Sequence, residues 1–324
     1  PETLEITPLY LYDSVIGKNA MEWHSFGGWD PTPTPFPPEA LPEPDYVIKW
    51  KSDELEQKVR DKTNIRYRDI MLSDVYNITE FSVVSFSPDY TPPDISDLTH
   101  LKNLKELSLY GTNITDISPL AELKNLEKLE LYKNKITDLS PLAELKNLEW
   151  LELTTNKITD ASPLAGLPKL KVLYIGDNNI ADIQPLASIK SLTLLTARYN
   201  MIVDISALVG LPDLEELDVM CNQIDNIDCI QEMESLVEFN AVDNQITTVK
   251  LSGMQKLQRL VLDENSICEI SLSDMPVLTK LLLNDNNITD VSGLTELKSL
   301  TTLDVRENPV ENIELMDFVR RVYD

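Results

Sequence analysis

A short alternation of apolar and polar positions recurs along most of the chain. Aliphatic residues occupy alternate positions in L-x-L triplets, and an asparagine and an isoleucine follow at fixed offsets, as in LELYKNKI (129–136) and LELTTNKI (151–158). A period of two places the apolar side chains on one face of a strand and the intervening side chains on the other. Each unit therefore predicts a short strand with one buried face, followed by a turn that contains the asparagine.

The same unit returns at an almost constant spacing. Consecutive asparagines of the pattern are separated by 22, 22, 22, 22, 22, 21, 21 and 22 residues. A repeat of this length with this pattern indicates a leucine-rich repeat solenoid, in which stacked units form a parallel β-sheet on the concave side. The asparagine amides are expected to turn inward and to satisfy backbone groups at the bend. These structural positions are Asn134, Asn156, Asn178, Asn200, Asn222, Asn244, Asn265, Asn286 and Asn308.

The second half of each unit predicts the convex side of the solenoid. It reads ITDISPLAELKNL (114–126) in the first complete copy, and the proline recurs at one register as Pro119, Pro141, Pro163 and Pro185. Proline lacks an amide donor, so this register needs no ladder hydrogen bond, and a 3₁₀ or short helical turn is expected. Two 21-residue units lack the S-P-L motif, at 247–257 and 268–278. More extended convex segments are predicted there.

A solenoid exposes its core at both ends unless it is capped. Residues 46–100 are predicted to form an N-terminal cap: a strand at 46–50, a helix at 52–62 with Ser52 or Asp53 as its N-cap, and a strand at 78–86. Leu55 and Val59 should lie on the buried face of this helix. The repeats are assigned to residues 101–310.

The remaining segments lie at the two ends of the chain. Residues 311–324 are predicted to form a C-terminal capping helix, because apolar residues recur at i, i+3, i+4 and i+7, as Leu315, Phe318, Val319 and Val322. Residues 30–45 contain seven prolines and are interpreted as a linker. Residues 1–29 are a leading segment to which the pattern assigns no structure.

Charge and composition exclude several classes of function. The formal net charge is −26, which disfavours nucleic acids and anionic membrane surfaces. No run approaches the roughly 20 apolar residues of a membrane span, so no direct membrane insertion is expected. Nucleotide-binding and catalytic fingerprints are missing from the sequence. The two histidines and the unpaired spacing of Cys221, Cys229 and Cys268 support neither a metal site nor a cofactor. We therefore expect a protein that is not an enzyme.

Function is expected on the concave face, where the outward residues of the strands can be enumerated. Aromatic residues and arginine anchor protein interfaces more often than other residues do. They gather in the N-terminal half, and the predicted partner-binding residues are Tyr110, Tyr132, Trp150, Tyr174, Leu194, Arg198, Tyr199, Glu130 and Glu152. Two structural readings stay open: tyrosines that merely stack across rungs, and carboxylates that reflect general surface acidity. The acidic residues on this face, among them Glu216, Asp218 and Glu238, favour a partner with a basic patch.

The order of cap and repeats, together with the D-[IL]-S-P-L half-repeat, resembles the bacterial internalin family of surface proteins. The resemblance covers about 45–310 and is strongest over 107–222. It implies a secreted or surface-attached bacterial protein whose concave face binds a protein, often on a host cell. The sequence departs from the family in its 21-residue units, and it ends at Asp324 before the immunoglobulin-like region that usually follows. The family's partner contacts occupy variable positions and are not carried over.

These observations lead to a non-enzymatic recognition module that is extracellular or on the bacterial cell surface, with any signal or anchor removed before Pro1. Two alternatives remain. An intracellular regulatory subunit of an enzyme could use 22-residue repeats, although the I-E-G-L motif of that class does not occur here in place of S-P-L. A carbohydrate-binding surface module could use the same aromatic residues.

Overall fold

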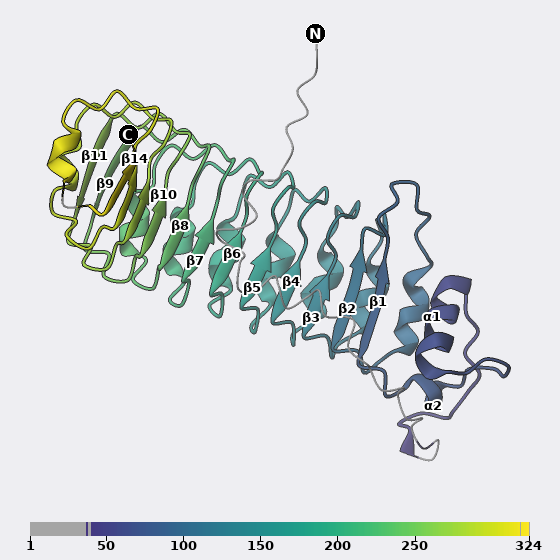
Figure 1. Cartoon of the computed structure of the whole chain (residues 1–324). Coiled ribbons are helices and arrows are strands. Elements are labelled where there is room, and N and C mark those ends of the chain that lie inside the picture. The colour runs from purple at the N-terminus through teal and green to yellow at the C-terminus, as the bar shows by residue number, and fades with distance from the viewer. Residues whose placement is uncertain (1–36, 38–39, 318, 324) are drawn as a thin grey trace, which may run out of the picture.

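The structure is a computed structural model that describes residues 37, 40–317 and 319–323. It is a curved, elongated solenoid whose strands lie side by side along one face, with a helical cap at one end (Figure 1). The leading segment 1–29 and most of the proline-rich segment lie outside the described residues. The predicted leucine-rich repeat fold is confirmed. None of the helices in the described part of the chain is long and apolar enough to cross a membrane.

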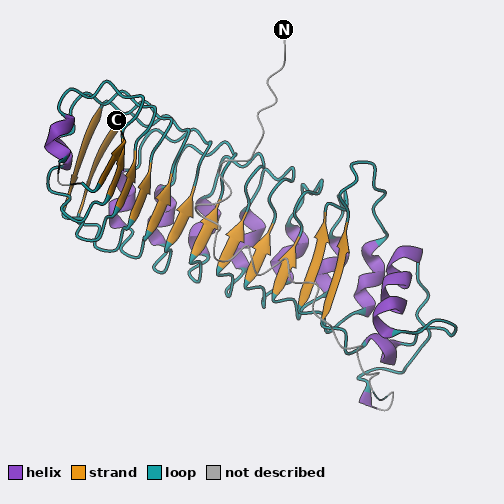
Figure 2. Cartoon of the chain, in the orientation of Figure 1, coloured by secondary structure: helices purple, strands orange, loops and turns teal. Residues whose placement is uncertain are grey.

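One parallel sheet of 12 strands lines the concave face (Figure 2). Its neighbours follow the chain order, apart from two strands that belong to a second sheet. Equivalent residues of successive repeats are paired, for example Leu129 with Leu151 and Leu151 with Leu173. The strands are β1 (Glu80–Val84), β2 (Glu106–Tyr110), β3 (Lys128–Glu130), β4 (Trp150–Glu152), β5 (Val172–Tyr174), β6 (Leu194–Thr196), β7 (Glu216–Asp218), β8 (Glu238–Asn240), β10 (Arg259–Val261), β12 (Lys280–Leu282), β13 (Thr302–Asp304) and β14 (Arg321–Tyr323).

The convex side consists mainly of 3₁₀ turns, as the proline register predicts. In η4 to η7 the proline lies in the first turn, where no amide donor is required. The two 21-residue units carry instead β9 (Thr248–Ser252) and β11 (Glu269–Ser273), which pair with each other in parallel. The extended convex segments predicted there are confirmed. The turns are η3 (Ile95–His100), η4 (Ser118–Glu122), η5 (Ser140–Glu144), η6 (Ser162–Gly166), η7 (Gln184–Ser188), η8 (Ser206–Gly210), η9 (Asp228–Glu232), η10 (Ser292–Leu294) and η11 (Ile313–Met316).

The core is continuous from the N-terminal cap to the last repeat. The leucines of the L-x-L triplets point into it, and Leu129, Leu131, Leu151 and Leu153 are fully buried. The convex turns contribute a second layer, in which the leucine after each proline is buried. Since each repeat buries its apolar residues only against its neighbours, the stability of the array depends on repeat-to-repeat contacts.

The asparagines satisfy the backbone at each bend. Asn178 donates from Nδ2 toward the carbonyl oxygens of Leu153, Ile175 and Gly176 at 3.1, 3.1 and 2.9 Å. Its Oδ1 accepts from the amide of Ile158 at 3.0 Å. Each asparagine therefore links its own turn to the preceding repeat. The same contacts occur at Asn134, Asn156, Asn200, Asn222, Asn244, Asn265, Asn286 and Asn308.

The N-terminal cap contains α1 (Asp53–Thr63) and α2 (Leu72–Val75). Ser52 is the N-cap of α1, and Leu55 and Val59 are buried beneath it, as predicted. The strand predicted at 78–86 is present as β1. The strand predicted at 46–50 is wrong, because Val47 forms only an isolated antiparallel bridge with Met71. The ladder stays short because α2 begins at Leu72 on one side of the bridge and the chain bends at residues 67 and 68 on the other.

The C-terminal capping helix predicted for 311–324 is also wrong. The segment forms the short turn η11 and then β14, which pairs in parallel with β13. Met316 and Val319 are buried, Leu315 is exposed, and Phe318 lies outside the described residues. A helix would have left the backbone groups at the edge of β13 without partners, whereas β14 satisfies them.

Candidate functional site

Three rows of outward-facing side chains run along the concave sheet, perpendicular to the strands. In the parallel ladder, equivalent residues of neighbouring repeats lie side by side, so members of one row are about 4.8 Å apart at the backbone. The first row contains Lys128, paired with Trp150. The second row contains Glu130, Glu152 and Tyr174, each paired with the next. The third row follows each second leucine or its equivalent, and it includes Tyr110, Tyr132, Thr154, Gly176 and Arg198.

The aromatic residues on this face form two groups. Tyr110 and Tyr132 stack in the third row, with ring centroids 4.9 Å apart and planes at 29°. Phe86 extends this group, since its ring is 5.3 Å from that of Tyr110 and its side chain is 75% exposed. In the second group the rings of Trp150 and Tyr174 lie 5.6 Å apart. The predicted stripe is thus divided across the sheet, and Phe86, which precedes the first complete repeat, was not among the predicted residues.

Glu130 and Glu152 lie side by side in the second row, in the repeats that carry Tyr132 and Trp150. Ser108 Oγ donates to Glu130 Oε2 at 2.7 Å, and the backbone amide of Thr154 donates to Glu152 Oε1 at 2.6 Å. Burial raises the pKa of both carboxyls. That of Glu152 reaches about 7, and the neighbouring charge of Glu130 adds to the effect.

Short side chains follow in the third row beyond Tyr132. Thr154 and Gly176 separate the stacked tyrosines from Arg198. A Cβ atom at Gly176 would lie 3.1 Å from Cγ of Arg198 and 3.6 Å from Cγ2 of Thr154. The absence of a side chain at 176 therefore lets the Arg198 side chain pack directly against the neighbouring repeat.

The remaining predicted residues come from the repeat that contains β6. Leu194 lies in the first row and Arg198 in the third, and both are half-buried. Arg198 is close enough to lower the pKa of the Glu152 carboxyl. Tyr199 instead lies in the turn after β6, where its backbone is left-handed with φ of 54°, and its side chain is 51% exposed. It belongs to the edge of the face rather than to the aromatic groups.

Two residues beside Tyr199 were not predicted. Met201 and Val203 are 42% and 51% exposed, and with Tyr199 they place three apolar side chains on the flank of one repeat. Other complete repeats have mainly polar or charged residues at these registers, such as Lys133, Lys135 and Thr137, or Asp243, Gln245 and Thr247. Comparison of each register across all repeats, rather than the concave positions alone, would have found this exposed ridge.

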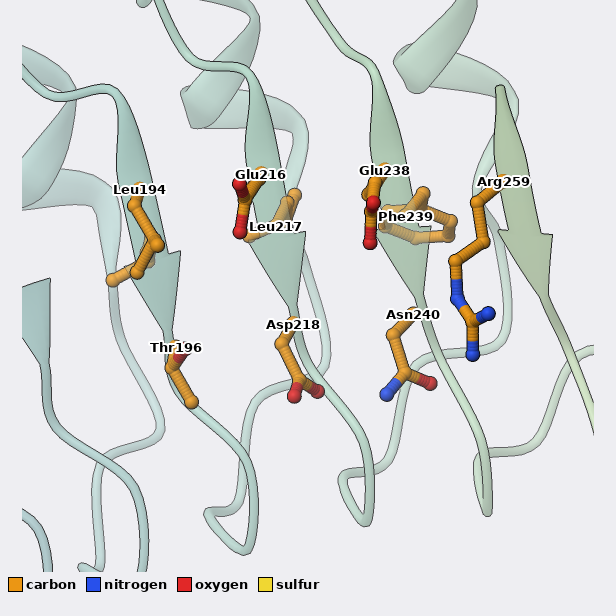
Figure 3. Close-up of a pocket in the computed structure, with 10 residues that line it drawn as sticks. Leu194, Thr196, Glu216, Leu217, Asp218, Glu238, Phe239, Asn240 and Arg259 are labelled. Carbon is orange, nitrogen blue, oxygen red and sulfur yellow. The ribbon is translucent and has the colours of Figure 1, made fainter. Parts of the chain in front are cut away.

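The C-terminal half of the face has a different character. Met220, Val242 and Val261 form a small apolar cluster that is separate from the main core. A hollow of about 260 Å³ lies over this cluster, and charged residues of both signs line it, including Arg198, Arg259, Asp263 and Lys280. Burial raises the pKa of Asp263 to about 6. In Figure 3, Glu216 and Glu238 occupy one row and Asp218 and Asn240 the next, while Arg259 extends from its strand toward the level of Asn240.

The part of the chain that the structure describes contains no metal site, and its cysteines are unpaired. Among residues 40–317 and 319–323, no group of three or more histidine, cysteine, aspartate or glutamate side chains is placed to hold a metal ion. Cys221, Cys229 and Cys268 are free thiols. Burial raises the pKa of Cys221 to about 12 and that of Cys229 to about 11, so both are protonated at neutral pH.

Comparison with known proteins shows the family to which this chain belongs. The family model described as "Leucine Rich repeats (2 copies)" matches residues 102–144, 146–188, 190–232 and 276–316. These ranges make up more than half of the chain, which belongs to the leucine-rich repeat family. The unmatched stretch 233–275 contains β9 and β11, the extended convex strands of the 21-residue units. No curated protein matches the sequence.

Within this family the protein is internalin-like. The crystal structure of the internalin InlF from Listeria monocytogenes is 27% identical, with a TM-score of 0.69 over 89% of this chain and 91% of that chain. Internalin C2 from the same organism is 32% identical over 57% of this chain and 91% of its own, with a TM-score of 0.50. The functional domain of InlJ, also from this organism, is 23% identical and shares the fold, with a TM-score of 0.68 over 84% of this chain and 59% of that chain.

Proposed function

We propose that this protein is a non-enzymatic recognition module, secreted or held on a bacterial cell surface, that binds a protein partner through the N-terminal half of its concave face. The observation that carries the proposal is the pair of aromatic groups, Phe86–Tyr110–Tyr132 and Trp150–Tyr174, on the outward side of the sheet. Rings in these positions add nothing to the main core, which lies on the other side of the strands. Aromatic anchors on a rigid surface are typical of protein interfaces.

The footprint that we propose contains the predicted residues and extends beyond them. Tyr110, Tyr132, Trp150 and Tyr174 provide the anchors, with Glu130 and Glu152 between them. Leu194, Arg198 and Tyr199 continue the footprint toward the flank, where Met201 and Val203 extend it. The solenoid supplies rigidity, so that little conformational entropy is lost on binding.

The test is a comparison of two variants in capture of proteins from cell-surface extracts. The first variant combines Tyr132→Ala, Trp150→Ala and Tyr174→Ala. The control combines Lys250→Ala and Glu269→Ala, which removes an exposed ion pair on the convex side. A protein captured by the unmodified chain and by the control, and then purified, should bind the triple variant at least about 100-fold more weakly, because interface anchors each contribute about 2 kcal/mol or more.

The proposal has two separable parts. Unchanged affinity of the triple variant, with circular dichroism showing that it is folded, would remove the binding face from the N-terminal half. Binding to glycans on an array, without capture of a protein from the extracts, would favour the carbohydrate-binding alternative. Fractionation of the producing cells, with the complete gene expressed, tests location separately, and a protein confined to the cytoplasm would favour the regulatory-subunit alternative.

A further inference from the structure

The pair of carboxylates between the aromatic groups has hydrogen bonds but lacks a countercharge in direct contact. Within the described part of the chain, no ion pair joins Glu130 or Glu152 to a lysine or arginine, and each receives one of the hydrogen bonds described above. The charged groups that face them are Lys128, whose ammonium lies 5.1 Å from the Trp150 ring centroid, and Arg198. A half-buried carboxylate loses part of its hydration, and a directly bound cation restores the lost stabilisation.

Aromatic side chains of β4, of the neighbouring strand β5 and of the turn after β3 supply the second half of the arrangement. Tyr132 is two residues after Glu130, Trp150 is two residues before Glu152, and Tyr174 is the ladder partner of Glu152. The faces of such rings attract cations, and a planar guanidinium stacks on them while it donates two hydrogen bonds to carboxylates. Arg198 packs against Gly176, so the protein's own guanidinium side chain borders this group on the side of the next repeat.

We infer that Glu130 and Glu152, together with Tyr132, Trp150 and Tyr174, form a binding site for an arginine side chain that the protein partner presents. The inference rests on the proposed function and names the chemistry that the partner must offer. Charge complementarity selects a cation, since the site has two adjacent carboxylates in a protein of net charge −26. The rings select an organic, planar cation over a hydrated metal ion, which would require additional oxygen ligands.

The site can be tested without the partner. The probe is Nα-acetyl-arginine methylamide, titrated into the full chain while the indole N–H resonance of Trp150 is followed by NMR and assigned with Trp150→Phe. The control probe is the citrulline analogue, which has nearly the same shape and no charge. The arginine compound should bind in the millimolar range and at least about 10-fold more tightly than the citrulline compound, because one charge-assisted contact contributes about 1.5–3 kcal/mol. Equal responses to the two compounds would overturn the inference.

Variants locate the site. Glu130→Gln with Glu152→Gln should abolish the difference between the two probes. The matched control, Glu122→Gln with Glu144→Gln on the convex turns η4 and η5, changes the formal net charge equally and should retain this difference. Loss of the difference in the control would mean that general acidity attracts the probe, and the inference would be wrong.

A partner identified by capture separates this inference from the proposed function. If the triple aromatic variant fails to bind the partner while Glu130→Gln with Glu152→Gln binds normally, the concave face stands and the arginine site does not. If both variants bind normally, both proposals fail. The arginine site is supported if the glutamine variant binds the partner about 10-fold or more weakly at both low and high salt, while the convex control binds normally.

Discussion

Glu152 shows how position in the sheet sets the chemistry of a single residue. Its side chain faces outward, yet neighbouring rings and the ladder partner Tyr174 remove much of its water. Burial raises its pKa from the ordinary 4.5 to about 7, against the effects of the Thr154 amide and of Arg198. Near neutral pH this carboxyl therefore exchanges between neutral and charged forms, which the sequence pattern alone does not reveal.

The raised pKa predicts a dependence of stability on pH. A carboxyl with a higher pKa in the folded state binds its proton more tightly there, so its contribution to stability is present at low pH and is lost between about pH 4.5 and pH 7. Glu152→Gln removes this loss while its amide oxygen can still accept the hydrogen bond from Thr154. We expect the variant to exceed the unmodified protein in unfolding free energy by on the order of 2 kcal/mol at pH 8.

Guanidinium unfolding of both proteins at pH 5 and pH 8 checks this. At pH 5 the difference between them should be clearly smaller than at pH 8, because only the first part of the loss between about pH 4.5 and pH 7 has then occurred. A variant that is less stable than the unmodified protein at pH 8 would show that the charged form is structurally useful. Glu152→Gln is thus expected to raise the stability of the fold and to weaken arginine binding. Such a trade-off is typical of a residue that is retained for function.

The turn after each strand is the element that converts the repeat into a solenoid. The residue before each asparagine has a left-handed backbone, with φ between 49° and 60°, at Lys133, Thr155, Asp177, Tyr199, Cys221, Asp243, Glu264, Asp285 and Glu307. That conformation costs of order 1–3 kcal/mol in residues other than glycine, asparagine and aspartate. The hydrogen bonds of the following asparagine hold the turn in place and offset this cost.

Removal of one such side chain should therefore be costly. Asn178→Ala leaves the carbonyls of Leu153 and Ile175 and the amide of Ile158 without their amide partner in a buried turn. We expect a loss of roughly 2–4 kcal/mol in unfolding free energy, measured by chemical denaturation. Asn179→Ala, one residue later and exposed, is the control and should change it by less than about 0.5 kcal/mol. Equal effects at the two positions would contradict the structural role of the asparagine.

The convex elements show where the residue pattern of one repeat is sufficient to predict the local structure. The proline register predicted the 3₁₀ turns η4 to η7, and the 21-residue units without S-P-L predicted the extended strands β9 and β11. Loss of the proline alone is not sufficient for a strand, because η8, η9 and η10 are 3₁₀ turns without it. The apolar stripe at 315–322 predicted a helix, and this prediction was wrong. The conformation of the segment depends on the edge of β13, which is contributed by residues outside the stripe.

At the scale of the whole molecule, the two ends differ in how they close one long core. The N-terminal end is covered by α1 and α2, whereas the C-terminal end is closed by η11 and β14 (Figure 1). The carboxylate of Asp97, buried in the first cap, accepts hydrogen bonds from the amides of Lys51 and Ser52 at 2.8 Å each. Repeats transmit stability only to their neighbours, so the caps protect the terminal repeats most.

The C-terminal closure predicts a test of this arrangement. Met316 is fully buried at the end of the core, and Met316→Ala should lower the unfolding free energy by about 2–5 kcal/mol. Hydrogen exchange should show the loss concentrated in β12 and β13, with little change in β2 to β4. Leu315→Ala, at an exposed neighbour, provides the control. Uniform acceleration of exchange along the whole sheet would contradict local transmission of stability.

The sequence by itself determined the repeat, the register of the strands, the inward leucines and asparagines, and the convex segments of the proline-containing and 21-residue units. These features follow from residue patterns within one unit and its identical contacts with the next. The tertiary structure decided how the ends close, how Phe86 joins Tyr110, how the rings divide into two groups around Glu130 and Glu152, and which flank exposes Met201 and Val203. These depend on contacts and burial among side chains of different repeats, which no single repeat encodes.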